Sequence, residues 1–215
     1  MIISKQKPFD EILDILSGID NIFVLGCGKC AKKLHTGGEP EVLVMRTKLL
    51  DAGKNVVGYG VKSTACTMNS WEEFCAENDN YDESGNKNSI KDADAILMMS
   101  CGSGISVISC VSDIPVYPAL NTTAIGGVLF DEIVSNQCAM CGQCSIDVFG
   151  GICPSTRCPK GLMNGPCGGS DDGICELGND RECAWKNIED RLNQLQSQQS
   201  LVDIQKPKDY SIPLN

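Results

Sequence analysis

The sequence predicts an α/β protein: a small doubly wound domain with a parallel sheet, then a cysteine-rich, metal-organised module with little regular structure, and a C-terminal helix. Two observations lead to this fold class. Short apolar runs alternate with amphipathic stretches in the first part of the chain, which is typical of βαβ units. From Cys138 to Cys183, eight cysteines lie among many glycines and few core-forming residues. We therefore expect an α/β domain over residues 1–135, a cluster-binding module over 136–184, and a C-terminal helix and tail over 185–215.

Four compact apolar runs in the first domain predict buried parallel strands. They cover residues 21–26, 55–61, 94–100 and 114–120. The stretches around them predict helices, because apolar residues recur at helical spacing or because proline, glycine and capping residues mark the ends. These helices cover residues 8–19, 40–53, 69–79 (capped by Asn69 or Ser70) and 104–113. In the last predicted helix, residues 182–196, one apolar stripe contains Trp185, Ile188, Leu192 and Leu195. The polar, proline-containing tail after it is either a frayed terminus or an arm that docks a partner.

Composition excludes several classes of function. The formal net charge of −10 argues against binding to nucleic acid and to anionic membrane surfaces, which attract basic patches. No apolar run has the roughly 18 residues of a membrane span, and the first residues lack the apolar region of a signal peptide. We expect a soluble, cytoplasmic protein. In such a reducing compartment, the fourteen cysteines predict metal sites rather than disulfides.

Four cysteines of the first domain follow the ends of predicted strands. Cys27 and Cys30 form a C-x-x-C pair after the first strand, Cys66 follows the second, and Cys101 ends the third. The carboxyl ends of parallel strands share one edge of the sheet, where α/β domains bind ligands. We therefore expect these four thiolates to hold a [4Fe–4S] cluster or, as an alternative, zinc. A nucleotide loop is disfavoured, because the glycines around these cysteines lack the third glycine of the dinucleotide fingerprint.

Two other cysteines of the first domain are predicted to pack. Cys75 shares the apolar face of its helix with Trp71 and Phe74, and Cys110 lies in an apolar helical stretch. Free cysteine frequently behaves as a small buried apolar residue. The aromatic residues Phe149 and Trp185, near cysteines of the second module, are likewise expected to pack rather than to form an electron route.

The second module contains enough cysteines for two four-thiolate sites. Its spacing begins with C-x2-C-x2-C, the start of the bacterial ferredoxin pattern, in which a remote cysteine completes the cluster. The ligands are Cys138, Cys141, Cys144, Cys153, Cys158, Cys167, Cys175 and Cys183. The natural grouping joins the first three with one late cysteine and the next three with another, and it leaves the places of Cys175 and Cys183 open. We favour two [4Fe–4S] clusters, with one cluster and one zinc ion as the alternative.

A longer set of motifs resembles a known family. The stretches "CAMCGQC", "GGICPSTRCPKGLMNGPCGGSDDGICE" and "ECAW", together with "GCGKCAKKLHTGGEPEV" near the start, resemble the small, cysteine-rich iron–sulfur subunit of the methylenetetrahydrofolate reductase of acetogenic bacteria. The same family occurs as a cysteine-rich domain after the flavin barrel of some larger reductases. The resemblance covers most of the chain.

The resemblance implies a role in one-carbon metabolism of the acetyl-CoA pathway. It implies that the chain pairs with a TIM-barrel flavoprotein and passes electrons by [4Fe–4S] clusters to or from the flavin. Folate and FMN chemistry would belong to this partner, so no residue of the present chain is expected to be catalytic. The electron donor stays open between a ferredoxin, a further redox subunit and a nicotinamide-linked module. The alternative function is a zinc-binding scaffold that docks and stabilises the flavoprotein.

Overall fold

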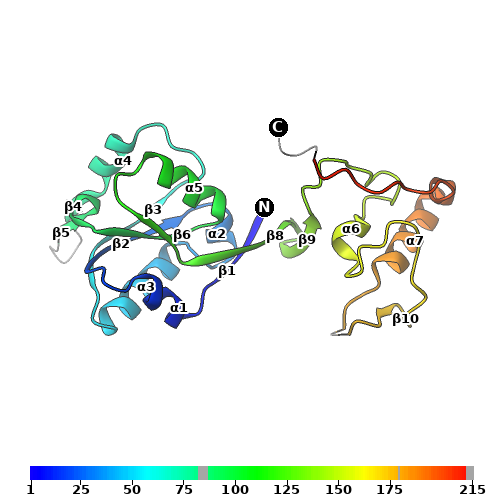
Figure 1. Ribbon diagram of the computed structural model, residues 1–215, viewed down its shortest axis with the longest axis horizontal. Helices are drawn as coiled ribbons and strands as arrows, with labels where there is room; N and C mark the ends of the chain where they lie inside the picture. The colour runs from blue at the N-terminus through cyan, green and yellow to red at the C-terminus, as the bar shows by residue number, and fades with distance from the viewer. Residues whose placement is uncertain (82–86, 179, 212–215) are drawn as a thin grey trace. The chain divides into compact units, whose positions relative to one another are not determined.

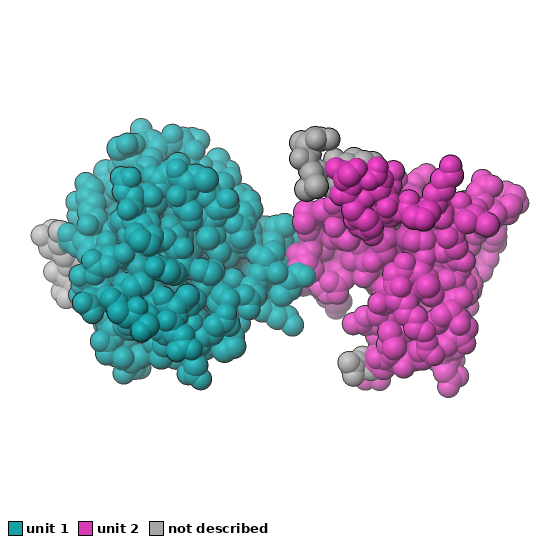
Figure 2. Space-filling model, in the orientation of Figure 1, with its two compact units in different colours: residues 1–123 teal, residues 124–215 magenta. Residues whose placement is uncertain are grey.

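The structure, a computed structural model, describes residues 1–81, 87–178 and 180–211. Two compact units divide the chain, unit 1 from Met1 to Thr123 and unit 2 from Ala124 to Asn215 (Figure 2). The sequence predicted boundaries after residues 135 and 184. Unit 2 contains a hairpin that ends at Cys138, the cysteine-rich loops and the C-terminal helix.

Unit 1 contains the predicted parallel sheet (Figure 1). Its strand order is β3-β2-β6-β7, and every neighbouring pair is parallel. At the carboxyl end, Gly26 of the central strand lies between Val61 and Met99. The strands are β2 (Asn21–Cys27), β3 (Asn55–Lys62), β6 (Ala95–Met99) and β7 (Val116–Pro118), which confirms the four predicted runs.

Helices cover both faces of this sheet, as the doubly wound prediction requires. Side chains that alternate along β2 and β6 enter two separate cores, with Ile22 and Leu97 in one and Phe23 and Ile96 in the other. The first core is completed by α1 (Phe9–Ile15) and α3 (Glu39–Asp51). The second is completed by α4 (Trp71–Glu77) and α5 (Gly102–Val111). The Ser70 hydroxyl caps α4 by accepting a 3.2 Å hydrogen bond from the Glu73 amide.

Short elements of unit 1 were not predicted, since they are too brief for a periodic pattern. They are β1 (Ile2–Gln6), α2 (Cys30–Lys33), the antiparallel pair β4 (Asp79–Tyr81) and β5 (Lys87–Ser89), and the 3-10 turn η1 (Ile90–Asp92). Of these, α2 bears on function, because it begins at one of the predicted ligand cysteines.

A long β-hairpin was also missed. Strand β8 (Leu120–Leu129) begins in unit 1, and its later residues pair antiparallel with β9 (Glu132–Cys138) in unit 2. With β1 the two strands form a three-stranded sheet in the order β1-β8-β9. The hairpin matters for the cysteine-rich module because β9 ends at the first of the eight cysteines.

Unit 2 has a small apolar core of its own. Phe149 packs with Trp185, Ile188 and Leu192 of helix α7 (Ala184–Leu195), and all four are buried. The sequence predicted a module shaped by metal in place of a core, so this core is a correction. The packing of Phe149 and Trp185 is as predicted, whereas Leu195 is 46 % exposed and does not join the stripe. The remaining elements are α6 (Pro154–Arg157), β10 (Ser170–Asp171), β11 (Ile174–Cys175) and η2 (Gln198–Leu201).

The tail after η2 is hydrogen-bonded to the loops of unit 2. Gln205 exchanges hydrogen bonds of 2.7 and 3.0 Å with the side chain of Asn164. The Lys208 ammonium donates to the Gln143 carbonyl and, at 3.0 Å, to the Ser145 hydroxyl. The segment up to residue 211 is therefore an arm that lies on its own unit, while residues 212–215 of the predicted arm lie outside the described residues. None of the helices described here has the length and apolar character needed to cross a membrane.

Candidate metal centres

The four predicted ligands of unit 1 gather at the carboxyl edge of the parallel sheet. Cys27 is the last residue of β2, and Cys30 is the first of α2. Cys101 lies two residues after the end of β6 and directly precedes α5. Cys66 lies in the loop after β3. The topology therefore places all four on loops that leave the same edge, as the sequence predicted from the parallel arrangement.

Close packing joins these loops. The Gly28 amide donates a 2.8 Å hydrogen bond to the Lys62 carbonyl, which links the C-x-x-C loop to the loop after β3. A Cβ atom on Gly104 would lie only 2.9 Å from the Ala65 Cβ, so glycine allows the start of α5 to approach the residue beside Cys66. Larger side chains would force these loops apart.

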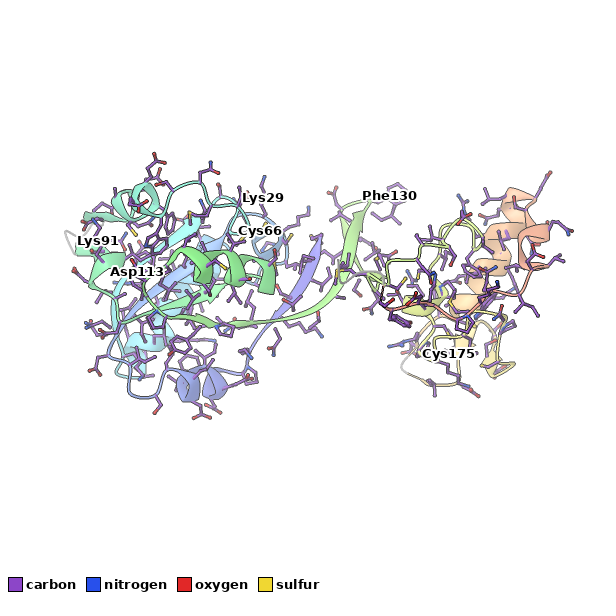
Figure 3. All side chains as sticks on the ribbon, turned by 45° about the horizontal axis from the view of Figure 1, so that its top comes forward. Lys29, Cys66, Lys91, Asp113, Phe130 and Cys175 are labelled. Carbon is purple, nitrogen blue, oxygen red and sulfur yellow. The ribbon has the colours of Figure 1, made fainter. Side chains whose placement is uncertain are left out.

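The four thiols differ in exposure. Cys27 and Cys101 are buried, Cys30 is half-buried, and Cys66 is exposed. The Ile2 amide lies 3.5 Å from the Cys30 sulfur and donates to it. Figure 3 shows Cys66 and Lys29 at the same end of unit 1. Amide donors and nearby ammonium groups stabilise thiolates, the form of cysteine that binds metal.

In unit 2, one cavity brings together a first group of cysteines. The cavity has a volume of about 250 Å³ and a mainly apolar lining that includes Ile146 and Phe149. Four thiol residues also line it: Cys138, Cys141, Cys144 and Cys153. The Met140 amide donates a 3.3 Å hydrogen bond to the Cys138 sulfur. Lys208 of the tail also lines the cavity.

The remaining four cysteines of unit 2 lie on segments that contact one another. Cys158 and Cys183 pack against the core of Phe149 and Trp185. The Cys175 amide donates to the Arg181 carbonyl at 2.8 Å, and the Cys183 amide donates to the Gly173 carbonyl at 2.7 Å. These two hydrogen bonds hold the segments before and after residue 179 side by side.

A hydrogen-bonded ion pair lies beside Cys167, the remaining cysteine of this second group. The Cys167 sulfur lies 3.8 Å from a carboxylate oxygen of Glu176, and the same oxygen accepts a hydrogen bond from the Lys160 ammonium. The hydrogen bond raises the pKa of Lys160 and lowers the pKa of Glu176, since it favours the charged form of both. The pair thereby connects the segments that carry Cys158, Cys167 and Cys175.

The thiols of the described residues do not close around a metal position. Within residues 1–81, 87–178 and 180–211, no three or more histidine, cysteine, aspartate or glutamate side chains have an arrangement that could hold a metal ion. The structure thus brings the predicted ligands to one sheet edge in unit 1 and to two neighbourhoods in unit 2. Their role as ligands stays a prediction.

The two cysteines assigned to packing behave differently. Cys75 is buried beside Phe74 in a core of unit 1, and burial raises the pKa of its thiol. Cys110 is exposed, so the prediction that it packs is wrong. It lies on the part of α5 that faces away from the sheet, whereas Ile108 of the same helix is fully buried.

Comparison with known families identifies the second half of the chain. Residues 117–211 match a family model described as "Methylene-tetrahydrofolate reductase C terminal". This segment is related to the methylenetetrahydrofolate reductase family. The matched residues include β8, all of the cysteines in the two groups of unit 2, and the tail that carries Lys208. No curated protein and no solved structure matched the chain.

Sequence reasoning missed two features of the reductase-related segment. Cys153 lines the cavity of the C-x2-C-x2-C loop, although the predicted grouping gave that loop a late cysteine. Lys208, which lies 64 residues beyond Cys144 in the sequence, adds a positive charge to the lining of the same cavity. Spacing along the chain contains no signal for either contact, because both arise where separate loops meet.

Proposed function

We propose that the chain is an iron–sulfur electron-transfer subunit that exchanges electrons with the flavin of a partner methylenetetrahydrofolate reductase. Two findings support this proposal. The segment that carries most of the cysteines is related to that reductase family. The chain also offers thiols in sets of four, which is the ligand set of [4Fe–4S] clusters.

The observation that carries the proposal is the cavity of unit 2 with its four thiols. We assign Cys138, Cys141, Cys144 and Cys153 as the ligands of one cluster. The site fits such a group, because its lining is mainly apolar and an amide already donates to one of the sulfurs. Apolar surroundings and hydrogen bonds to sulfur are the means by which proteins hold and tune iron–sulfur clusters.

By the same reasoning, the second group of unit 2 supplies another site. Its ligands would be Cys158, Cys167, Cys175 and Cys183, which places Cys175 and Cys183 together. The thiols at the sheet edge of unit 1, Cys27, Cys30, Cys66 and Cys101, would supply the third. The alternative at one site of unit 2 is zinc, since four thiolates also form closed structural zinc sites.

Each bound cluster would accept and release one electron at a time, and the residues of the chain would set how readily this occurs. Phe149 and Ile146 limit the access of water to the cavity. The net charge of −10 disfavours the addition of another electron, so we expect low reduction potentials. Lys208 opposes this effect locally, because an ammonium near the cavity stabilises added negative charge.

The partner in this proposal is a flavin-containing, TIM-barrel reductase subunit that binds FMN and the folate. A ferredoxin or another redox subunit would be the electron donor. Neither FMN nor the folate would bind to this chain.

Anaerobic purification of the full chain, alone and with its flavoprotein, tests the proposal. We expect iron and acid-labile sulfide in amounts that match the assigned sites, and a broad visible absorption that bleaches when the protein is reduced. A colourless, folded protein that contains zinc but no iron would support the scaffold function. Redox titration that finds only positive potentials would contradict the expected low values.

A further inference from the structure

A polar cleft in unit 2 has a composition that is unusual for this acidic chain. The cleft has a volume of about 370 Å³ and lies between the end of β9, helix α6 and the segment before α7. Two arginines line it, Arg157 of α6 and Arg181. Volumes of roughly 300–1,000 Å³ are typical of sites for small molecules. The cleft is separate from the cavity of the first four thiols, with which it shares only Gln137.

Within the described residues, the two guanidinium groups have no partner. Among the described residues, no ion pair, side-chain hydrogen bond or ring contact involves the guanidinium of Arg157 or of Arg181. The other arginines of the chain differ. Arg191 donates a hydrogen bond to Gln194, and Arg46 lies over the ring of Tyr59. The full chain has 28 acidic residues, yet none of those that the structure describes forms an ion pair with either arginine of this cleft.

The rest of the lining is compatible with a negative ligand. The side chains of Asn136, Gln137 and Thr156 add neutral polar groups around the arginines. Glu182 is the one acidic residue that lines the cleft, and its carboxylate accepts a 2.8 Å hydrogen bond from the Asn187 side chain. That bond ties the Glu182 carboxylate to α7, so the lining has two guanidinium groups and one carboxylate.

We propose that this cleft binds a small organic anion that carries at least two carboxylate or phosphate groups. Each guanidinium presents a planar set of donors that matches one carboxylate or phosphate in a bidentate manner. Arg157 and Arg181 come from separate segments of the chain, so one ligand with two anionic groups satisfies both. The site is independent of the electron-transfer function, because neither arginine is an assigned cluster ligand.

Calorimetric titration of the full, anaerobically purified chain tests this site. The probes are citrate for carboxylates, pyrophosphate for phosphates, and acetate as an anion with a single group. We expect saturable binding of citrate or of pyrophosphate, and the probe that binds more tightly identifies the chemistry of the ligand. Binding should weaken as salt increases, since charge attraction supplies most of the affinity. Acetate should bind at least about tenfold more weakly, because it satisfies one guanidinium only.

Matched variants separate the cleft from general charge effects. Arg157→Gln and Arg181→Gln should each weaken binding about tenfold or more, whereas Arg191→Gln, which removes the same charge outside the cleft, should not. Arg157→Lys retains the charge and the long side chain and should still lose affinity, since lysine cannot bind in the bidentate manner. Far-ultraviolet circular dichroism and iron content establish that each variant is folded and loaded.

Two results would overturn the proposal. One is the absence of saturable binding of both citrate and pyrophosphate to the unmodified chain. The other is an equal loss of affinity in the Arg191 variant and in the cleft variants. If a glutamine variant does not fold, nuclear magnetic resonance of the unmodified chain takes the place of that variant. Addition of the probe that binds must then shift two arginine Nε–H signals and leave the other arginine signals unchanged.

Discussion

Trp185 lies edge-on against Phe149, with the ring centroids 5.7 Å apart and the ring planes at 85°. The indole nitrogen of the same tryptophan donates a 3.0 Å hydrogen bond to the Leu162 carbonyl. One side chain of α7 therefore holds two loops of the cysteine-rich unit, one before and one after the segment that carries Cys153 and Cys158. This contact explains how a glycine-rich chain segment keeps a defined course beside its predicted metal sites.

We expect Trp185→Ala to destabilise unit 2 by about 3–5 kcal/mol, because it leaves a cavity in a core of four buried residues. Trp185→Phe retains an aromatic ring but loses the hydrogen bond to the half-buried Leu162 carbonyl, so it should cost less, about 0.5–1.5 kcal/mol. Hydrogen exchange of the α7 amides in the full chain measures both effects. Exchange in β2 of unit 1 serves as the control and should not change. Unaltered protection of α7 in the alanine variant would show that this core does not support the unit.

Cys75 and Cys110 should differ in reactivity toward iodoacetamide. Cys75 is buried and its pKa is raised, so little thiolate is present or accessible, whereas Cys110 is exposed. Mass spectrometry of the native protein should find alkylation at Cys110 and find Cys75 modified only after unfolding. Cys75→Ser should cost about 1–3 kcal/mol, since it buries a hydroxyl, and Cys110→Ser should change stability by less than about 0.5 kcal/mol. Equal labelling of the two native thiols would contradict the structure.

Cys153→Ser and Cys158→Ser test the proposed division of the ligands. If Cys153 completes the set of Cys138, Cys141 and Cys144, its loss should alter the same electron paramagnetic resonance signal as the loss of Cys141. Cys158→Ser should alter a different site, because Cys158 belongs to the second group. Cys110→Ser is the matched control and should retain every signal. The division is wrong if the Cys153 and Cys158 variants affect the same signal and the Cys141 variant affects another.

Lys208→Met should lower the potential of one cluster only. The ammonium of Lys208 lines the cavity of the first four thiols, so its removal takes away a positive charge that favours the reduced state. Lys206→Met, in the same tail but outside that lining, is the control. Potentiometric titration of both variants measures the effect. A uniform shift of every cluster, or equal shifts in the two variants, would exclude a local role for Lys208.

Phe130→Asn should stabilise the hairpin of β8 and β9 by about 1 kcal/mol. Leu129 pairs with Glu132, so Phe130 and Asp131 form a two-residue turn, and both have positive φ angles, of 48° and 66°. This backbone suits asparagine better than phenylalanine. Figure 3 shows Phe130 at the hairpin tip, where it is 92 % exposed, so the ring gains little from packing. Urea unfolding compares the variants, with Phe130→Leu as a control that retains the strain. A loss of stability in the asparagine variant would contradict this account.

Local sequence patterns were sufficient for the parallel sheet of unit 1 and the helices that cover it. The runs at 21–26 and 94–100 are apolar on both faces, and only a strand covered by helices on both sides accommodates such runs. The hairpin of β8 and β9 escaped prediction because most of its side chains are exposed or half-buried, so neither strand has a clear apolar alternation. Cys110 was misjudged because an apolar helical stretch does not by itself reveal which side meets the sheet.

By itself, the sequence determined the class of the fold, the shared sheet edge of Cys27, Cys66 and Cys101, and the likeness of the later cysteines to a reductase family. These features depend on the order of residues along the chain. Only the tertiary structure decided that Cys153 joins the cavity of the C-x2-C-x2-C loop, that the tail brings Lys208 to it, and that Arg157 and Arg181 share a cleft. Such contacts join segments far apart in the chain, and they follow from how α7 and its small core pack the loops of unit 2 together.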